Sequence, residues 1–160
     1  MTARAPFQVL GPANFKKRFK LAARTQRWAV TMTKVCIRQL MSAAPFPRWH
    51  FVSFTGARGR ESRGVVDLIA IRKDHKAYKG LKRGDRFQII LIQVKGGYAA
   101  NPTVDDADRL RAVARYHRAQ CVLLASWKKG TPVQFFSLRT KRSPSHADWV
   151  KVSDLKQVFN

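Results

Sequence analysis

Acidic residues are scarce in this chain. Only 9 Asp and Glu oppose 32 Lys and Arg among its 160 residues, so the formal net charge is +23 at pH 7. Residues 1–60 contain 12 basic residues and no acid, and the first carboxylate is Glu61. Such an excess destabilises a compact fold by self-repulsion unless a polyanion neutralises it. The composition favours nucleic acid as that polyanion, because each phosphate contact also releases condensed counterions.

Long apolar runs, paired cysteines and metal-binding histidine motifs are also missing. No apolar run approaches the roughly 20 residues of a membrane span, so we expect no membrane partner. Cys36 and Cys121 are isolated and form neither a disulfide framework nor a zinc motif, which favours a reducing, cytoplasmic compartment. The four histidines lack helical metal spacing, and no glycine-rich phosphate loop occurs. A zinc site and a nucleotide-binding loop are therefore not expected.

The periodicity of apolar residues predicts one α/β domain over residues 1–160, with an irregular lead-in at 1–13 and a C-terminal extension at 139–160. Runs that are apolar on both faces indicate strands covered on both sides. The acid-free, Arg-rich amino end is also typical of a mitochondrial transit peptide, but we expect a structural helix there. The predicted elements are helix 15–43, strands 49–54, 65–71 and 87–94, helix 104–119, strands 122–126 and 133–138, edge strand 149–152 and helix 153–159.

Three polar residues stand in or beside otherwise apolar strands. Asp67 lies within the run 65–71, while Gln93 and Lys95 end the run that starts at Phe87. Burying an unpaired charge is costly, so a partner, a metal or an exposed strand end is expected. Side chains alternate along a strand, so Gln93 and Lys95 share a face, and antiparallel pairing would bring Asp67 beside them. A structural ion pair between Asp67 and Lys95 is the simpler alternative.

The same residues suit metal-assisted chemistry on a phosphate. Carboxylate, amide and backbone carbonyl oxygens are ligands for a hard cation such as Mg²⁺. A lysine beside such a cluster can hold a water or stabilise the charge that develops on a reacting phosphate. The pattern therefore predicts a metal site at the ends of two strands.

Two segments resemble a known family. Residues 64–69 (Gly-Val-Val-Asp-Leu-Ile) and 92–97 (Ile-Gln-Val-Lys-Gly-Gly) are similar to the signature of the PD-(D/E)XK nuclease superfamily, which includes restriction endonucleases, archaeal Holliday-junction resolvases and virus-type replication-repair nucleases. The resemblance spans residues 15–138. It implies a restriction-endonuclease-like fold in the order αβββαβ, with a mixed central sheet flanked by helices. It also implies Asp67 as the metal-binding aspartate and Lys95 as the catalytic lysine.

Gln93 departs from the usual acidic residue of that signature, as in Mrr-type restriction nucleases. An amide oxygen can coordinate Mg²⁺ or Mn²⁺ but brings no charge, so metal binding should be weaker unless another acid helps. Glu61 is the candidate for that role, as a metal ligand and catalytic residue, and the Val94 backbone carbonyl is a further candidate ligand. Glu61 could equally pair with neighbouring arginines. Many family members carry a glutamate on the first helix, and this chain has no acid there.

Basic residues gather before and after the strand that carries Asp67. We expect them to bind phosphates, which orients a nucleic acid without reading its sequence. The predicted phosphate-binding residues are Arg58, Arg60, Arg63, Lys73, Lys76, Lys79, Lys82 and Arg83.

The favoured function is a Mg²⁺-dependent endonuclease that acts on DNA, with RNA possible as a partner. A non-catalytic nucleic-acid-binding protein on a decayed nuclease fold is the main alternative, and a basic RNA- or ribosome-associated protein is another. Cutting both strands of a duplex would favour a symmetric homodimer.

Overall fold

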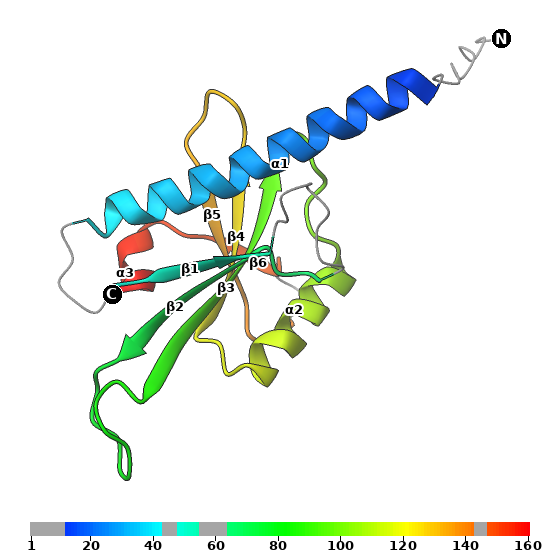
Figure 1. Ribbon diagram of the computed structural model, residues 1–160. Coiled ribbons are helices and arrows are strands. Elements are labelled where there is room, and N and C mark those ends of the chain that lie inside the picture. Colours follow the sequence, from blue (N-terminus) through cyan, green and yellow to red (C-terminus); the bar gives the residue numbers. More distant parts are fainter. Residues whose placement is uncertain (1–11, 43–47, 55–63, 143–146) are drawn as a thin grey trace.

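The computed structural model describes residues 12–42, 48–54, 64–142 and 147–160, without the side chains of 12–17 and 19. Three helices and six strands lie within those ranges (Figure 1). In chain order they are α1 (Pro12–Leu40), β1 (His50–Ser53), β2 (Leu68–Asp74), β3 (Arg86–Gly96), α2 (Val104–Tyr116), β4 (Cys121–Trp127), β5 (Gln134–Leu138), β6 (Trp149–Lys151) and α3 (Leu155–Phe159).

All six strands form one mixed sheet in the order β1-β2-β3-β4-β5-β6. Strands β1, β2 and β3 pair antiparallel, β3 and β4 pair parallel across the α2 crossover, and β5 and β6 continue antiparallel. The elements from α1 to β4 follow the αβββαβ order of a restriction-endonuclease-like fold, as predicted. The edge strand β6 and the short helix α3 were also predicted, and they extend this core.

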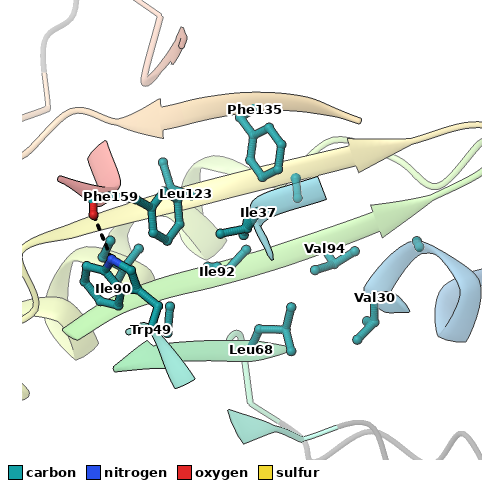
Figure 2. Packing of buried hydrophobic residues seen from close by; sticks show 13 residues of the cluster. Val30, Ile37, Trp49, Leu68, Ile90, Ile92, Val94, Leu123, Phe135 and Phe159 are labelled. Carbon is teal, nitrogen blue, oxygen red and sulfur yellow. Dashed lines mark hydrogen bonds between the residues drawn. The ribbon is translucent and has the colours of Figure 1, made fainter. Parts of the chain in front are cut away.

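Helices cover both faces of the sheet (Figure 1). One layer joins α1 and α3 to alternate strand residues such as Ile90, Ile92 and Leu123 (Figure 2). The other layer joins α2, through Ala107 and Leu110, to the intervening residues. This double coverage explains why the central strands are apolar on both faces.

Helix α1 starts earlier than the predicted residue 15, because Pro12 can occupy a first helical turn, where its missing N–H forms no intrahelical bond. It ends at Leu40 rather than at residue 43. Its buried stripe is Ala29, Val30, Thr33 and Ile37. None of the helices in the described ranges is long and apolar enough to cross a bilayer.

A second apolar stripe of α1 faces away from the core. Leu21 and Trp28 are 56% and 54% exposed. An aromatic residue such as Trp28 would be expected in the core from its side chain alone, and this expectation is wrong here, because a straight helix can bury only one side against the sheet.

Strand β2 is shifted by three residues from the predicted run 65–71. It pairs with β3 from Leu68 to Asp74, so Asp67 lies at the entrance of the strand and not inside it. Val65 leaves the ladder and packs with the α2 layer. The charge at residue 67 therefore stands at a sheet end, where it is less costly than in the strand interior.

The C-terminal helix is tied to the first strand by an aromatic contact. The indole Nε1 of Trp49 donates to the Phe159 carbonyl at 2.8 Å, and the two rings meet edge to face with centroids 5.3 Å apart (Figure 2). The Arg72 guanidinium lies 4.5 Å above the Trp49 ring and donates to the same carbonyl at 3.0 Å. Phe159 is 1% exposed, so this cluster closes the α1 layer of the core.

Replacement of Phe159 by alanine should lower the free energy of unfolding by about 3–5 kcal/mol, because it leaves a cavity and removes the ring that Trp49 contacts. Chemical denaturation measures this. The control Val150→Ala, at a side chain that is 42% exposed, should cost about 0.5 kcal/mol or less. Equal denaturation midpoints for the two variants would show that α3 contributes nothing to the core.

Candidate functional site

A cleft of about 910 Å³ opens at the end of the sheet where β2 begins and β3 ends. Helix α1 forms one wall, and the start of α2 contributes to another. The described lining residues are Arg18, Leu21, Ala22, Ala23, Thr25, Gln26, Gly64, Val65, Asp67, Gln93, Val94, Lys95, Gly96, Gly97, Tyr98, Ala99, Asp106 and Arg109. The structure thus brings Asp67, Gln93, Val94 and Lys95, which the sequence singled out, to one cleft.

Asp67 is hydrogen-bonded to backbone groups of both neighbouring segments, the end of β1 and the end of β3. Its N–H donates to the Ile92 carbonyl at 3.1 Å, and its own carbonyl accepts the Phe54 N–H at 3.0 Å. Its carboxylate Oδ2 accepts the Val94 N–H at 2.6 Å. These contacts tie the carboxylate to the segment that carries Gln93 and Lys95, so its orientation is fixed by the sheet.

Gln93 is a buried amide near the end of β3. The side chain is 6% exposed, and Oε1 has no hydrogen-bond partner among the described residues. A buried acceptor without a partner normally costs about 1–3 kcal/mol. A bound ion or water would satisfy such an oxygen. Lys95 follows two residues later on the same face of β3 and is half-buried.

Gln26 of α1 is a site residue that the sequence analysis missed. Its Nε2 donates to the Val94 carbonyl at 2.8 Å, and it lines the cleft. Gln26 stands where helical spacing continues the buried stripe of Ala29, Thr33 and Ile37, so a polar residue on that face was the available signal. The first helix therefore contributes an amide to the site, although it contributes no acid.

Gly96 allows α1 to approach β3 this closely. A Cβ atom built on Gly96 would lie 3.0 Å from the Ala29 Cβ and 3.1 Å from the Thr25 carbonyl oxygen. The next residue, Gly97, has a φ of +66°, a conformation that favours glycine, and its N–H donates to the Trp127 carbonyl at 2.8 Å. The Gly-Gly pair after Lys95 thus turns the chain out of the sheet beneath α1.

Asp106 adds a second carboxylate to the cleft wall. It completes a capping box at the start of α2, since its Oδ2 accepts the Thr103 N–H at 3.1 Å and the Thr103 hydroxyl accepts the Asp106 N–H at 3.1 Å. The Thr103 backbone hydrogen bond, with the positive charges of Lys95 and Arg109 adding to it, lowers the pKa of Asp106 below its usual value. Asp106 therefore both caps α2 and lines the cleft, and only the second of these positions depends on the tertiary fold.

The oxygen donors of this cleft fit a hard divalent cation, with few charges among them. Asp67 supplies a carboxylate, Gln93 an unpartnered amide oxygen, and Val94 a carbonyl that has a second lone pair beyond the Gln26 hydrogen bond. No group of three or more His, Cys, Asp or Glu that could hold a metal occurs in the described part of the chain. Glu61, the further acid that the sequence suggested, lies outside the described residues.

The predicted phosphate-binding residues fall into two groups. Lys73 is exposed near the end of β2, and Lys76, Lys79, Lys82 and Arg83 are exposed on the connection between β2 and β3. That connection projects at the far end of these strands from the cleft (Figure 1). Arg58, Arg60 and Arg63 lie outside the described residues. Among the described residues, the cations that line the cleft itself are Arg18, Lys95 and Arg109, of which only Lys95 was predicted from the sequence.

Comparison with known proteins gives little further information. No family model matches the chain, and no curated protein matches it. Among solved structures, the chain is similar to the Holliday junction resolvase Hjc of the hyperthermophilic archaeon Archaeoglobus fulgidus. The two are 16% identical, and the alignment covers 77% of this chain and 86% of the resolvase with a TM-score of 0.39.

Proposed function

We propose that this protein is a metal-dependent endonuclease that hydrolyses phosphodiester bonds of DNA in the cleft between α1 and the end of β3. The observation that carries the proposal is the buried Gln93 oxygen, which has no hydrogen-bond partner among the described residues and lies beside a carboxylate that backbone hydrogen bonds hold in place. A cation would satisfy that oxygen. The formal charge of +23 supplies the affinity for a polyanionic substrate.

Asp67, Gln93 and the Val94 carbonyl would hold Mg²⁺ or Mn²⁺, with Glu61 as a candidate further ligand. A bound divalent cation would polarise the phosphate and lower the pKa of a coordinated water. Lys95 would hold the attacking water and place a positive charge near the developing phosphorane. Gln26 would keep the Val94 carbonyl pointed at the site, and Arg18 and Arg109 would bind phosphates at the rim.

A second candidate is a DNA-binding protein without catalytic activity. The scarcity of charge among the donors favours it, since only Asp67 brings a carboxylate from the two strand ends and no larger acid cluster exists in the described residues. An amide in place of an acid weakens metal binding. This candidate predicts affinity for DNA with no cleavage at any metal concentration.

Asp67→Asn and Lys95→Ala should each lower the cleavage rate by at least about 100-fold, because each removes a charge that acts on the reacting phosphate. DNA affinity should stay within a few-fold of wild type, since it comes mainly from the basic surface. Gel-resolved cleavage kinetics and fluorescence anisotropy measure the two quantities separately.

The control for these variants is Lys151→Ala, which removes an exposed lysine on the edge strand β6, away from the cleft. It should cleave like wild type. Wild-type cleavage rates in both Asp67→Asn and Lys95→Ala would place the active site elsewhere.

Gln93→Glu tests the metal-ligand role directly. An added carboxylate among the ligands should reduce the metal concentration that gives half-maximal cleavage several-fold, because ligand charge raises affinity for Mg²⁺. A metal titration of the cleavage rate measures this, with Gln134→Glu, at an exposed residue of β5, as the matched charge control. If Gln93 only fills a strand end, the variant instead keeps the wild-type metal dependence or unfolds at lower temperature from an unpaired buried charge.

A further inference from the structure

The connection between β2 and β3 and the strand ends beside it form a basic arm, which we call the basic hairpin (residues 73–86). Its exposed cations are Lys73, Lys76, Lys79, Lys82, Arg83 and Arg86. In Figure 1 it projects beyond the rest of the molecule, with only its base in the sheet. Like charges gathered on an exposed arm repel one another, so a polyanionic partner would stabilise this arrangement.

Both carboxylates of the basic hairpin accept hydrogen bonds from groups within the hairpin. Asp74 is 5% exposed and accepts the Lys76 N–H at 3.0 Å and the Tyr78 hydroxyl at 2.7 Å. The Tyr78 hydrogen bond, with the Lys76 backbone bond adding to it, lowers the pKa of Asp74. Asp85 accepts the Lys82 N–H at 2.8 Å. The two carboxylates thus shape the arm, and among the described residues its lysines form no salt bridge.

Further contacts hold the basic hairpin in one shape. The Arg86 guanidinium lies 4.5 Å above the Tyr78 ring, and the Gly84 N–H donates to the Asp74 carbonyl at 3.1 Å. Gly80 and Gly84 take φ values of +79° and +89°, which the tight turns require. An arm fixed in this way presents its cations at a defined distance from the sheet.

That distance follows from the strand geometry. Lys73 lies six residues along the chain from Asp67, which at about 3.3 Å per residue places it about 20 Å from the cleft. Side chains 67, 69, 71 and 73 share one face by alternation, so Lys73 and Asp67 face the same side of the sheet. The turn carries the other lysines farther out. A DNA duplex rises about 3.4 Å per base pair, so the arm is about six or more base pairs from the cleft.

We propose that the basic hairpin is a second phosphate-binding surface for duplex DNA, which engages the duplex about six or more base pairs from the bond cleaved in the cleft. The inference rests on the proposed nuclease function and specifies its substrate class as a double helix about one turn or more in length. A two-stranded β-ribbon also fits the width of the major groove, so the arm can follow a duplex without a clash.

The test compares two triple variants of the full chain with equal loss of charge. Lys79→Gln, Lys82→Gln and Arg83→Gln neutralise the tip of the basic hairpin. Lys141→Gln, Lys151→Gln and Lys156→Gln neutralise three exposed lysines outside it. The value of kcat/KM is measured on a cross-linked duplex of about 5 base pairs, which is shorter than the distance between cleft and arm, and on one of about 30 base pairs, which is about three helical turns long.

The hairpin variant should lose at least about tenfold in kcat/KM on the long duplex relative to the control variant, and match the control on the short one, which cannot reach both surfaces. Because kcat/KM reports only productive encounters, a short duplex that binds the arm alone does not disturb the comparison. Equal values for the two variants on the long duplex would overturn the inference. A similar loss on both lengths would also overturn it, since the arm would then act beside the cleft.

A binding measurement separates this inference from the proposed function. In EDTA, the slope of log Kd against log salt on the long duplex should fall by about 0.9 for each phosphate that a variant no longer neutralises, and more for the hairpin variant than for the control. If wild type cleaves no substrate, the proposed nuclease function fails, and this slope still decides whether the arm contacts DNA. An unchanged slope in the hairpin variant would overturn the arm's role whether or not cleavage occurs.

Discussion

The antiparallel ladder between β2 and β3 is the constraint on which both the cleft and the arm depend. Its register runs from Leu68 opposite Ile92 to Asp74 opposite Arg86. At one end it brings the Asp67 carboxylate onto the Val94 N–H, and at the other it sets the base of the basic hairpin. A shift of one residue would turn Asp67 away from the face that Gln93 and Lys95 share. The distance between cleft and arm is likewise a property of this one pairing.

Carboxylates are few in this chain, and most of the described ones have a structural role. Most of the described acids have a backbone or arginine partner that orders a turn, a helix start or the join between α2 and the strands beyond it. Asp74 and Asp85 order the hairpin, Asp106 and Asp154 cap helices, and Asp108 and Asp148 pair with the buried Arg111. Few of the described acids therefore remain to offset the basic surface, and at the two strand ends amide and carbonyl oxygens stand beside the single carboxylate of Asp67.

Much of the fold and the centre of the site follow from local patterns. Apolar runs and helical spacing predicted the order of elements, and the polar residues at 67, 93 and 95 pointed to one strand end. What escaped prediction depends on contacts between distant segments. Gln26 meets Val94 only because the rotation of α1 and the missing side chain of Gly96 let the helix descend onto β3. The lysines of the basic hairpin lie far from the cleft because of the strand direction and the exact start of β2. Periodicity predicts a strand start only to within several residues.

The central claim is that metal-assisted hydrolysis occurs in this cleft, and cleavage by the wild-type protein tests it most directly. Purified protein is incubated with duplex, branched and single-stranded DNA in Mg²⁺, in Mn²⁺, in Ca²⁺ and in EDTA. The account predicts cleavage of duplex-containing substrates with Mg²⁺ or Mn²⁺ and none in EDTA. Tight, salt-dependent binding with no cleavage of any substrate in either metal, or cleavage that persists in EDTA, would contradict it.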